Sequence, residues 1–336
     1  MKTLGFIPSR NTRLNVNYYT QNLRMQRILL PVVTLIFFVS CQKNVEPAPV
    51  PAPIPVIAPF KILDSAGMVN DLQLLSSDAF KGRKAGTPEV VLTHQLIQTR
   101  LRTALNDSLA PGYAQDFSVG GIARKNLLGV LRGTLYPDRY IVAGAHYDHL
   151  GVNGTGVVFH GADDNASGVA CVLAMAKYFK QHPPKYSMIF ALWDAEEVGL
   201  KGSEYFVNNL PAGISLSTLK FNLNMDMIAR SDNNKIWASG LSHYPAFAYL
   251  VDSVKGSAQT ELLSGFDKLS DPQDWTYLSD HGNFFQKNIP YLYLGVEDHP
   301  DYHKTTDTFD KINLGRYIQN ANIAAQMMLL LDRKLN

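Results

Sequence analysis

The segment Tyr186–Gly199, "YSMIFALWDAEEVG", decides the fold of this chain. Its first part, up to Trp193, is almost entirely apolar, which is typical of a β-strand buried on both faces of a parallel sheet. Directly afterwards the sequence turns acidic, with Asp194, Glu196 and Glu197. In parallel α/β sheets, sites form just beyond the carboxyl ends of the strands. The segment therefore predicts a central strand that leads into a functional site.

The sequence on either side repeats this pattern of buried strands and amphipathic helices. We expect strands at 126–131, 139–145, 186–193, 219–226 and 289–295, and helices at 88–106, 168–180 and 314–335. Strands that alternate with helices favour a largely parallel sheet with helices on both faces. We therefore predict one α/β domain over residues 60–336, built on a mostly parallel, mixed central β-sheet.

Composition and charge are those of an ordinary globular chain. Of its 336 residues, 46% are hydrophobic and 18% are charged. Lysine and arginine together number 31, and aspartate and glutamate 29, so the formal net charge is +2. Such a balance gives no broad basic surface for nucleic acid, and we expect no nucleic-acid partner.

Residues 1–40 are typical of a secretory signal. Basic residues precede the apolar run Ile28–Ser40, which is too short to span a bilayer comfortably. Met25, directly before this region, offers an alternative start. The sequence "FVSC" resembles a bacterial lipobox, which implies cleavage before Cys41 and attachment of lipid to its thiol. The alternatives are an uncleaved anchor or a cysteine that is there by chance.

Residues 41–59 are rich in proline, which favours an extended, semi-rigid tether. Together with a lipid on Cys41, this tether predicts an exported, membrane-anchored lipoprotein of the bacterial cell envelope. The other cysteine, Cys171, lies within an apolar helical pattern and is expected to be a small buried hydrophobe.

Carboxylates and imidazoles gather just after several of the expected strands. They are His146, Asp148 and His149 after 139–145, Asp226 at the end of 219–226, and His299 and His303 after 289–295, with Asp163 and Asp164 on an intervening loop. Carboxylates that converge in a desolvated pocket raise one another's pKa, a conflict that a divalent cation removes. Oxygen and nitrogen donors without thiolate suit zinc, and two metals that share a carboxylate suit hydrolysis.

Each of these residues also has a purely structural explanation. The pair Asp163–Asp164 could cap the following helix, and the pair Glu196–Glu197 could be solvated. His146 could be a core imidazole, Asp226 could only end its strand, and His303 could lie on the surface. Singly, each explanation is reasonable. Together, five such positions just beyond strands or on an adjoining loop favour a shared site.

Several segments form a recognisable set. In chain order they are "AHYDHLG", "GADDNASG", "DAEEVGLKGS", "NMDMIAR", "SDHGNFFQKNIP" and "YHKTTDT", with "SSDAFKGRKAGTP" (Ser76–Pro88) upstream. In this set the chain resembles the M28 zinc aminopeptidases, over nearly all of its length after the tether. The resemblance implies a co-catalytic two-zinc exopeptidase that removes N-terminal residues from peptides with a free amino terminus, using a water that bridges the two ions. The segment 106–139 is too short for the protease-associated domain that some members insert there.

The resemblance also assigns roles to individual residues. His146 and Asp226 would bind one zinc ion, Glu197 and His303 the other, and Asp164 would bridge the two. Glu196 would be the general base, and Tyr302 is a candidate donor to the oxyanion.

Neighbouring residues would support these ligands. Asp148 would accept a hydrogen bond from the imidazole of His146 and so fix the tautomer of that histidine. Asp163 and Asn165 would shape the loop and cap the helix that follows. His149 and His281 lie in matching motifs but receive no ligand role.

Two other functions stay open at this point. A glutaminyl cyclase shares this fold and looks like a one-zinc relative, although the complete set of five ligand positions favours hydrolysis. A surface lipoprotein that binds peptides or metal without turnover is the non-enzymatic alternative, which an intact Glu196 disfavours. The loops Gly240–Tyr244 and Leu263–Trp275 are candidates for the walls of a substrate pocket.

Overall fold

The structure of the chain is a computed structural model that describes residues 62–105, 107–254 and 260–335. All of these residues fall within one unit, Pro53–Asn336. The expected signal, the cysteine expected to carry lipid and the proline-rich tether lie outside the described residues. No described helix is both long enough and apolar enough to cross a membrane.

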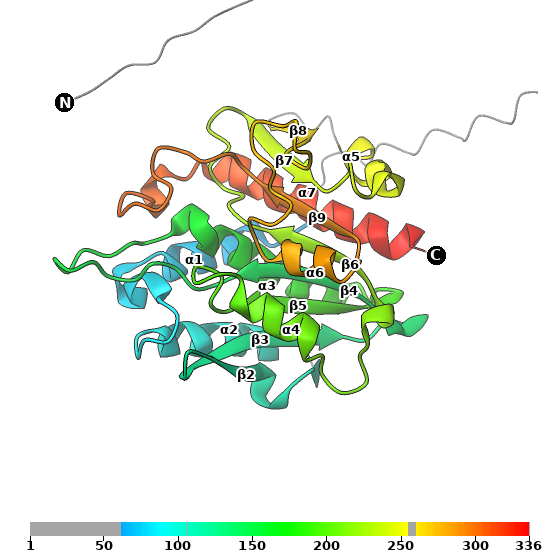
Figure 1. Ribbon diagram of the computed structural model, residues 1–336, viewed down its shortest axis with the longest axis horizontal. Helices are drawn as coiled ribbons and strands as arrows, with labels where there is room; N and C mark the ends of the chain where they lie inside the picture. Colours follow the sequence, from blue (N-terminus) through cyan, green and yellow to red (C-terminus); the bar gives the residue numbers. More distant parts are fainter. Residues whose placement is uncertain (1–61, 106, 255–259, 336) are drawn as a thin grey trace, which may run out of the picture. The chain divides into compact units, whose positions relative to one another are not determined.

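A mixed β-sheet forms the centre of the described structure (Figure 1). Its strands are β1 (Asp107–Ser108), β2 (Ala114–Val119), β3 (Ile122–Leu131), β4 (Tyr136–His146), β5 (Tyr186–Trp193), β6 (Leu219–Met225), β7 (Lys235–Ser239), β8 (Glu261–Ser264) and β9 (Tyr291–Gly295). They lie in the order β1-β3-β5-β4-β6-β9-β7-β8, with β2 paired to β3. Strands β5, β4, β6 and β9 pair in parallel, whereas β3 and β7 flank them antiparallel. The predicted mixed sheet is confirmed, and its parallel pairs are concentrated in the middle.

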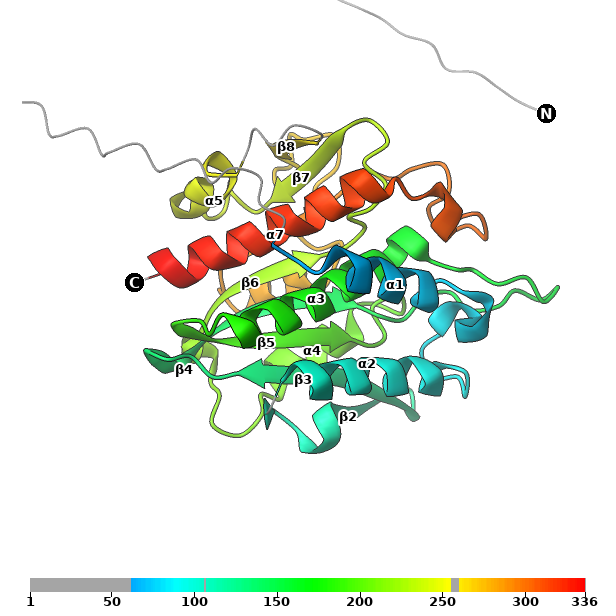
Figure 2. The same ribbon diagram turned by 180° about the vertical axis from the view of Figure 1, so that it is seen from behind.

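Helices cover both faces of this sheet, as the two opposite views show (Figures 1 and 2). One face carries α1 (Ser65–Leu75), α2 (Val90–Ala104), α3 (Gly168–Gln181) and α7 (Leu314–Lys334). The other face carries α4 (Lys201–Asn208) and α6 (His281–Gln286). The short helix α5 (Ala248–Asp252) packs near α7 and β8. The predicted α/β architecture with helices on both faces is therefore confirmed.

Strand β5 shows why the sequence favoured this architecture. Every residue of β5 is buried. Met188, Phe190 and Leu192 belong to the larger hydrophobic core, whereas Ile189 and Trp193 belong to the smaller one. Alternate side chains of a strand point to opposite faces, so a strand covered on both sides needs apolar residues throughout.

A buried histidine on α2 predicts that the stability of the fold depends on pH. His94 Nε2 lies 2.8 Å from the Tyr147 hydroxyl, which itself donates to the Lys125 carbonyl oxygen, so Nε2 carries the donated proton. Burial, aided by the charge of Lys125, lowers the pKa of His94 from 6.5 to about 4. Between these values the unfolded chain binds more protons than the folded chain. The free energy of unfolding should therefore decrease as the pH falls from 6.5 to about 4.

We expect His94 to account for a loss of about 1–3 kcal/mol over this interval. The measurement is denaturant unfolding of metal-free wild type and His94→Gln at a series of pH values. Wild type should lose more stability toward low pH than the variant does. Parallel curves for the two proteins would contradict the prediction.

Candidate metal centre

Three neighbouring parallel strands end at the same edge of the sheet, and each end carries residues of the predicted site. His146 is the last residue of β4, the pair Glu196–Glu197 follows β5, and Asp226 follows β6. Strand β4 lies between β5 and β6, so the three ends are adjacent. The parallel centre of the sheet thus brings together side chains that are far apart in the sequence.

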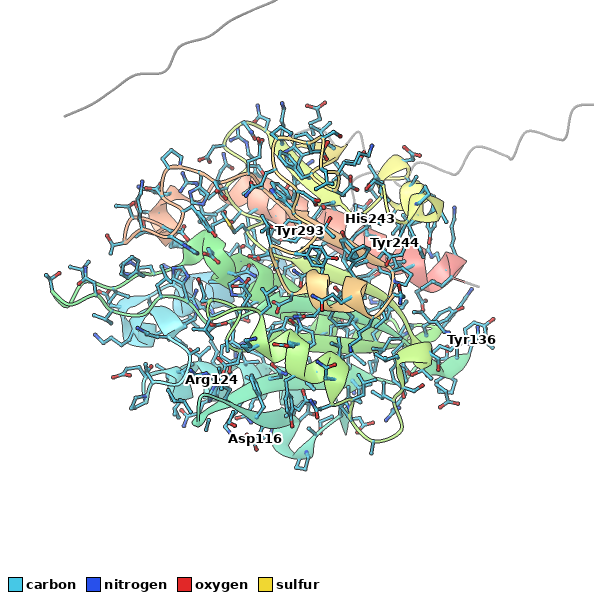
Figure 3. All side chains as sticks on the ribbon, viewed as in Figure 1. Asp116, Arg124, Tyr136, His243, Tyr244 and Tyr293 are labelled. Atoms are coloured by element: carbon cyan, nitrogen blue, oxygen red, sulfur yellow. The ribbon has the colours of Figure 1, made fainter. Side chains whose placement is uncertain are left out.

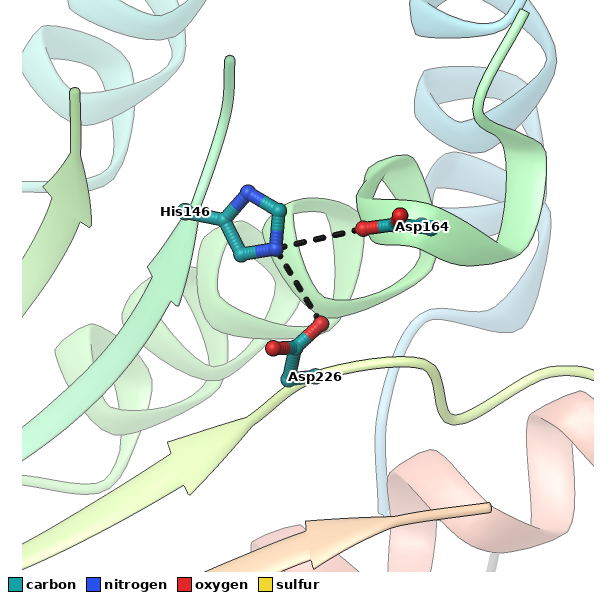
Figure 4. A group of neighbouring side chains, drawn as sticks. All are labelled: His146, Asp164 and Asp226. Carbon is teal, nitrogen blue, oxygen red and sulfur yellow. Dashed lines mark hydrogen bonds and ion pairs between the residues drawn. The ribbon is translucent and has the colours of Figure 1, made fainter. Parts of the chain in front are cut away.

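The first group of potential metal ligands consists of His146, Asp164 and Asp226 (Figure 4). His146 Nε2 is 3.3 Å from Asp164 Oδ1 and 3.1 Å from Asp226 Oδ1. All three residues are buried. Figure 4 shows that they approach from three segments: the end of β4, the short helical segment Ala162–Ser167 before α3, and the end of β6. These are the two residues predicted for one zinc ion and the predicted bridging residue.

A second group consists of His149, Asp164 and Glu197, with His303 beside it. His303 Nε2 is 3.1 Å from Asp164 Oδ2 and 3.3 Å from Glu197 Oε2. His149 Nδ1 is 2.7 Å from Glu197 Oε1. Asp164 therefore faces the first group with one carboxylate oxygen and the second group with the other. The structure brings the five predicted ligands together and adds His149, whose position in the "HYDH" motif was the signal for it.

A buried arginine holds the loop that carries Asp164. The Arg83 guanidinium donates to the backbone carbonyl oxygens of Leu75, Tyr147, His160 and Gly161 at distances of 2.7–2.9 Å. The residue is fully buried. Arg83 belongs to the upstream segment "SSDAFKGRKAGTP", for which the sequence predicts no individual role. Through Arg83, this segment holds the backbone of the loop that leads to Asp164.

Asp163 ties three loops together beside Asp164. Its Oδ1 accepts from the backbone N–H of Ala229 at 2.6 Å, and its Oδ2 lies 3.2 Å from His299 Nε2. The Asp307 carboxylate accepts from the backbone N–H groups of both Asp163 and Asp164 at 3.1 Å. This network links the loop before α3 to the loops after β6 and β9, as the expected loop-shaping role of Asp163 requires.

Asn165 and Asp148 orient the backbone around the site. Asn165 Oδ1 accepts from the Gly168 N–H at the start of α3, at 3.0 Å, as expected of a capping side chain. The Asp148 carboxylate accepts from the two backbone N–H groups of the pair Glu196–Glu197, at 3.0 and 3.3 Å. His146 Nδ1 lies 3.1 Å from the Asp148 backbone carbonyl but 3.8 Å from the carboxylate. The expected support of His146 by Asp148 is therefore made by the main chain, and the side chain positions the glutamates instead.

Asp226 is oriented by side chains for which the sequence alone predicts no role. Ser279 Oγ donates to Asp226 Oδ2 at 2.7 Å, and Asn224 Nδ2 donates to Ser279 Oγ at 3.0 Å. The hydroxyl of Tyr293, labelled in Figure 3, donates to the Asp226 backbone carbonyl at 3.0 Å. These contacts direct Asp226 Oδ1 toward His146.

The loop 263–275, predicted as a pocket wall, carries aromatic residues that pack beside β9. Trp275 stacks on Phe266 with 4.0 Å between ring centroids, and its ring meets that of Tyr293 at 5.5 Å. His281 Nε2 donates to the Trp275 backbone carbonyl at 2.8 Å, so this histidine supports the loop. Because Tyr293 also contacts Asp226, the aromatic cluster adjoins the site.

Opposite charges compensate one another in the site. Burial alone would lower the pKa of His146, but Asp226 and the other acids outweigh it and raise that pKa well above its usual value. Burial alone would raise the pKa of Asp164, but the surrounding imidazoles hold it well below its usual value. Hydrogen bonds to Asp164 and Glu197 raise the pKa of His303 to about 10. The raised pKa values of His146 and His303 favour their positively charged forms, which balance the carboxylates in the absence of metal. A divalent cation that displaced these protons would take over this role.

Glu196 and Tyr302 lie beside the two groups. Burial, together with the negative charge of Asp226, raises the pKa of Glu196 well above its usual value despite the opposing charge of His146. The Tyr302 ring stacks on that of His303 with 3.9 Å between centroids. Burial and the nearby acids also raise the pKa of the Tyr302 hydroxyl, so this group keeps its proton and can donate.

The donor set fits zinc, because both groups offer carboxylate oxygens and imidazole nitrogens without thiolate. Fold and site together define an α/β protein with two potential metal positions joined by one carboxylate. The chain belongs to peptidase family M28, whose model matches residues 126–328 and includes all five predicted ligands. The family prediction is thereby confirmed.

Known proteins share part of this sequence or its fold. Leucine aminopeptidase 2 of Trichophyton rubrum is 29% identical over 222 residues, which are 58% of this chain and 42% of the relative, so the match spans less than half of that protein. A zinc aminopeptidase from Bacillus subtilis has the same fold, with a TM-score of 0.63 at 15% identity over 82% of this chain and 97% of its own. A glutaminyl cyclase from Bacteroides thetaiotaomicron also has it, with a TM-score of 0.61 at 17% identity over 82% and 99%.

Proposed function

We propose that the chain is a zinc-dependent aminopeptidase that uses two Zn²⁺ ions to hydrolyse N-terminal residues from peptides. One observation carries the proposal: Asp164 Oδ1 lies 3.3 Å from His146 Nε2, while Asp164 Oδ2 lies 3.1 Å from His303 Nε2. A carboxylate that faces two ligand groups suits two metals about 3.5–4 Å apart. Family membership and the similarity to aminopeptidases support the same reaction.

The proposal assigns each residue a task. One ion would be held by His146, Asp164 and Asp226, and the other by Asp164, Glu197 and His303. Zinc bound there would supply a water with a pKa lowered to about 7 and would polarise the scissile carbonyl. Glu196 accepts the proton of that water and returns it to the leaving amine. Tyr302 donates a hydrogen bond to the oxygen on which negative charge develops.

The acidic character of the edge supports an exopeptidase. The carboxylates of Glu196, Glu197 and Asp226 lie at adjoining strand ends. Two of them would be balanced by the metal that they bind, whereas Glu196, which belongs to neither ligand group, would attract the ammonium group of a free peptide N-terminus and place the first peptide bond beside the ligand groups. An internal peptide segment has no such group, so we propose that cleavage starts at the N-terminus.

Removal of metal is the direct test of the proposal. We expect hydrolysis of a panel of aminoacyl chromogenic substrates to be lost after chelation and restored by added Zn²⁺. Elemental analysis of the active protein should find two zinc ions per chain. A rate that chelation leaves unchanged would refute the metal-dependent mechanism, and activity only on N-blocked peptides would refute the exopeptidase assignment.

Glutaminyl cyclase is the second candidate, because a cyclase shares the fold. The presence of all five ligand side chains in two adjoining groups favours hydrolysis. A peptide that begins with glutamine separates the two reactions. Release of free glutamine supports the aminopeptidase, whereas formation of pyroglutamate with loss of ammonia supports the cyclase.

We also propose that the protein is exported and anchored to a bacterial membrane by lipid on Cys41. The apolar run, the "FVSC" sequence and the proline-rich segment that follows support this location. The intact mass of the mature protein tests it. A mass that corresponds to cleavage before Cys41 plus acyl chains is expected, and an unmodified thiol at this position would contradict it.

A further inference from the structure

We propose that His149 is a positioning residue of the second ligand group, whose Nδ1–H holds one oxygen of Glu197 and leaves the other for metal. This inference rests on the proposed function, because it concerns the second of the two zinc positions. The resemblance to the family assigns His149 no role. The burial and the contacts of His149 in the structure indicate a role for it.

The distances direct the His149 imidazole to one carboxylate. Nδ1 lies 2.7 Å from Glu197 Oε1 but 3.6 Å from Asp164 Oδ2. The first value is that of a charge-assisted N–H···O hydrogen bond, and the second is too long for one. The His149 side chain is completely buried, so water does not compete for this contact.

The other ring nitrogen indicates which atom carries the proton. His149 Nε2 is buried and has no hydrogen-bond partner among the described residues. A proton on Nδ1 therefore finds an acceptor, whereas a proton on Nε2 finds none. A metal bound to Nδ1 would force the proton onto Nε2, where it would be a buried donor without an acceptor, which is unfavourable. The geometry thus favours a donor to Glu197 over a further metal ligand.

The ring is held in this orientation by the backbone around it. The His149 backbone N–H donates to the Arg83 carbonyl oxygen at 3.3 Å. Gly161, with a φ of +56°, lies against the ring, and a Cβ at this position would come within 2.5 Å of His149 Cδ2. The loop anchored by Arg83 thus encloses His149 as well as supporting Asp164.

The contact determines which oxygen of Glu197 stays available. Oε1 accepts from His149, whereas Oε2 lies 3.3 Å from His303 Nε2. Glu197 would therefore bind metal through Oε2 and occupy a single coordination position. Partners of metal ligands typically contribute about 10–100-fold to metal affinity. We expect His149 to act on the second ion and to leave the first unaffected.

Two substitutions separate the possible roles of His149. In His149→Ala the donor is lost. In His149→Asn the amide nitrogen lies near the position of Nδ1, so a donor to Glu197 is kept, but an amide nitrogen does not bind zinc. The assay is calorimetric titration of the metal-free proteins with Zn²⁺ alone, which reports the number of ions and both affinities. Thermal unfolding of the same metal-free samples checks that each variant is folded.

We expect His149→Ala to bind the second ion about 10–100-fold more weakly than wild type, with the first affinity unchanged and with His149→Asn close to wild type. Wild-type affinities in His149→Ala would overturn the inference. The inference would also be overturned if both variants bound the second ion equally weakly and the X-ray absorption spectra of the zinc-loaded variants showed one nitrogen donor fewer than that of wild type. In that case His149 would be a ligand. A wild-type protein that binds fewer than two zinc ions would instead refute the proposed two-metal function on which the inference rests.

Discussion

Replacement of Glu196 with glutamine is expected to lower aminopeptidase turnover by about 10²–10⁴-fold, the usual contribution of a general base. Glutamine has nearly the same shape as glutamate, but its amide cannot accept and return the proton of the attacking water. Glu196 belongs to neither potential ligand group, and its backbone N–H is held by the Asp148 carboxylate at 3.0 Å. The zinc content should therefore stay at the wild-type level, so that the loss lies in the chemical step.

The measurement combines steady-state kinetics with elemental analysis of the same sample. Glu204→Gln is the matched control, because Glu204 makes a half-exposed ion pair with Lys201 on α4. This control should keep both its turnover and its metal. If Glu196→Gln also keeps its turnover, another group accepts the proton. If it loses zinc, Glu196 is a ligand.

Asp164→Asn should have the widest effect of any single substitution at the site. Among the residues that the structure describes, Asp164 alone belongs to both potential ligand groups, with Oδ1 near His146 and Oδ2 near His303. Asparagine removes the negative charge and one of the two oxygens, while the imidazoles lose the carboxylate that balances them. We expect both affinities for zinc to fall together, and turnover to fall at least as far as in Glu196→Gln.

Titration of metal-free Asp164→Asn with Zn²⁺ tests this prediction, with thermal unfolding to show that the variant is folded. Asp78→Asn is the control. The exposed Asp78 pairs with His160, which lies on the loop that leads to Asp164, but it belongs to neither potential ligand group. Loss of only one ion would place Asp164 in a single metal site. Normal binding of both ions would remove it from the centre altogether.

The long, strongly patterned elements could be predicted from the sequence. Strand β5 spans Tyr186–Trp193 as predicted, and α3 and α7 begin at the predicted residues Gly168 and Leu314. Short elements were not predicted, among them β7 (Lys235–Ser239) and α6 (His281–Gln286). A few residues do not establish a hydrophobic period, so the formation of such elements depends on tertiary contacts. Strand β3 likewise starts before its predicted boundary because its first half pairs with β2.

The location of the site was accessible from sequence because the motifs follow strands that end at one edge of the sheet, and the family resemblance then implied which residues are ligands. The supporting contacts were not accessible from sequence. Nothing in the linear sequence shows that Arg83 donates to carbonyl groups of the Asp164 loop, or that Ser279 orients Asp226. Asp148 was expected to support His146 with its side chain but does so with its carbonyl group. Such hydrogen bonds depend on side-chain directions and on backbone segments far apart in the chain.

The sequence by itself therefore determined the α/β architecture, the edge of the sheet that carries the site and the residues that gather there. Hydrophobic period and strand direction suffice for these, since burial on two faces and parallel pairing leave few arrangements. Only the tertiary structure decided that His149 reaches Glu197 and that Arg83 holds the loop that carries Asp164. Contacts of this kind depend on shifts of a few ångströms between loops, and those shifts are set by the packing of the whole domain.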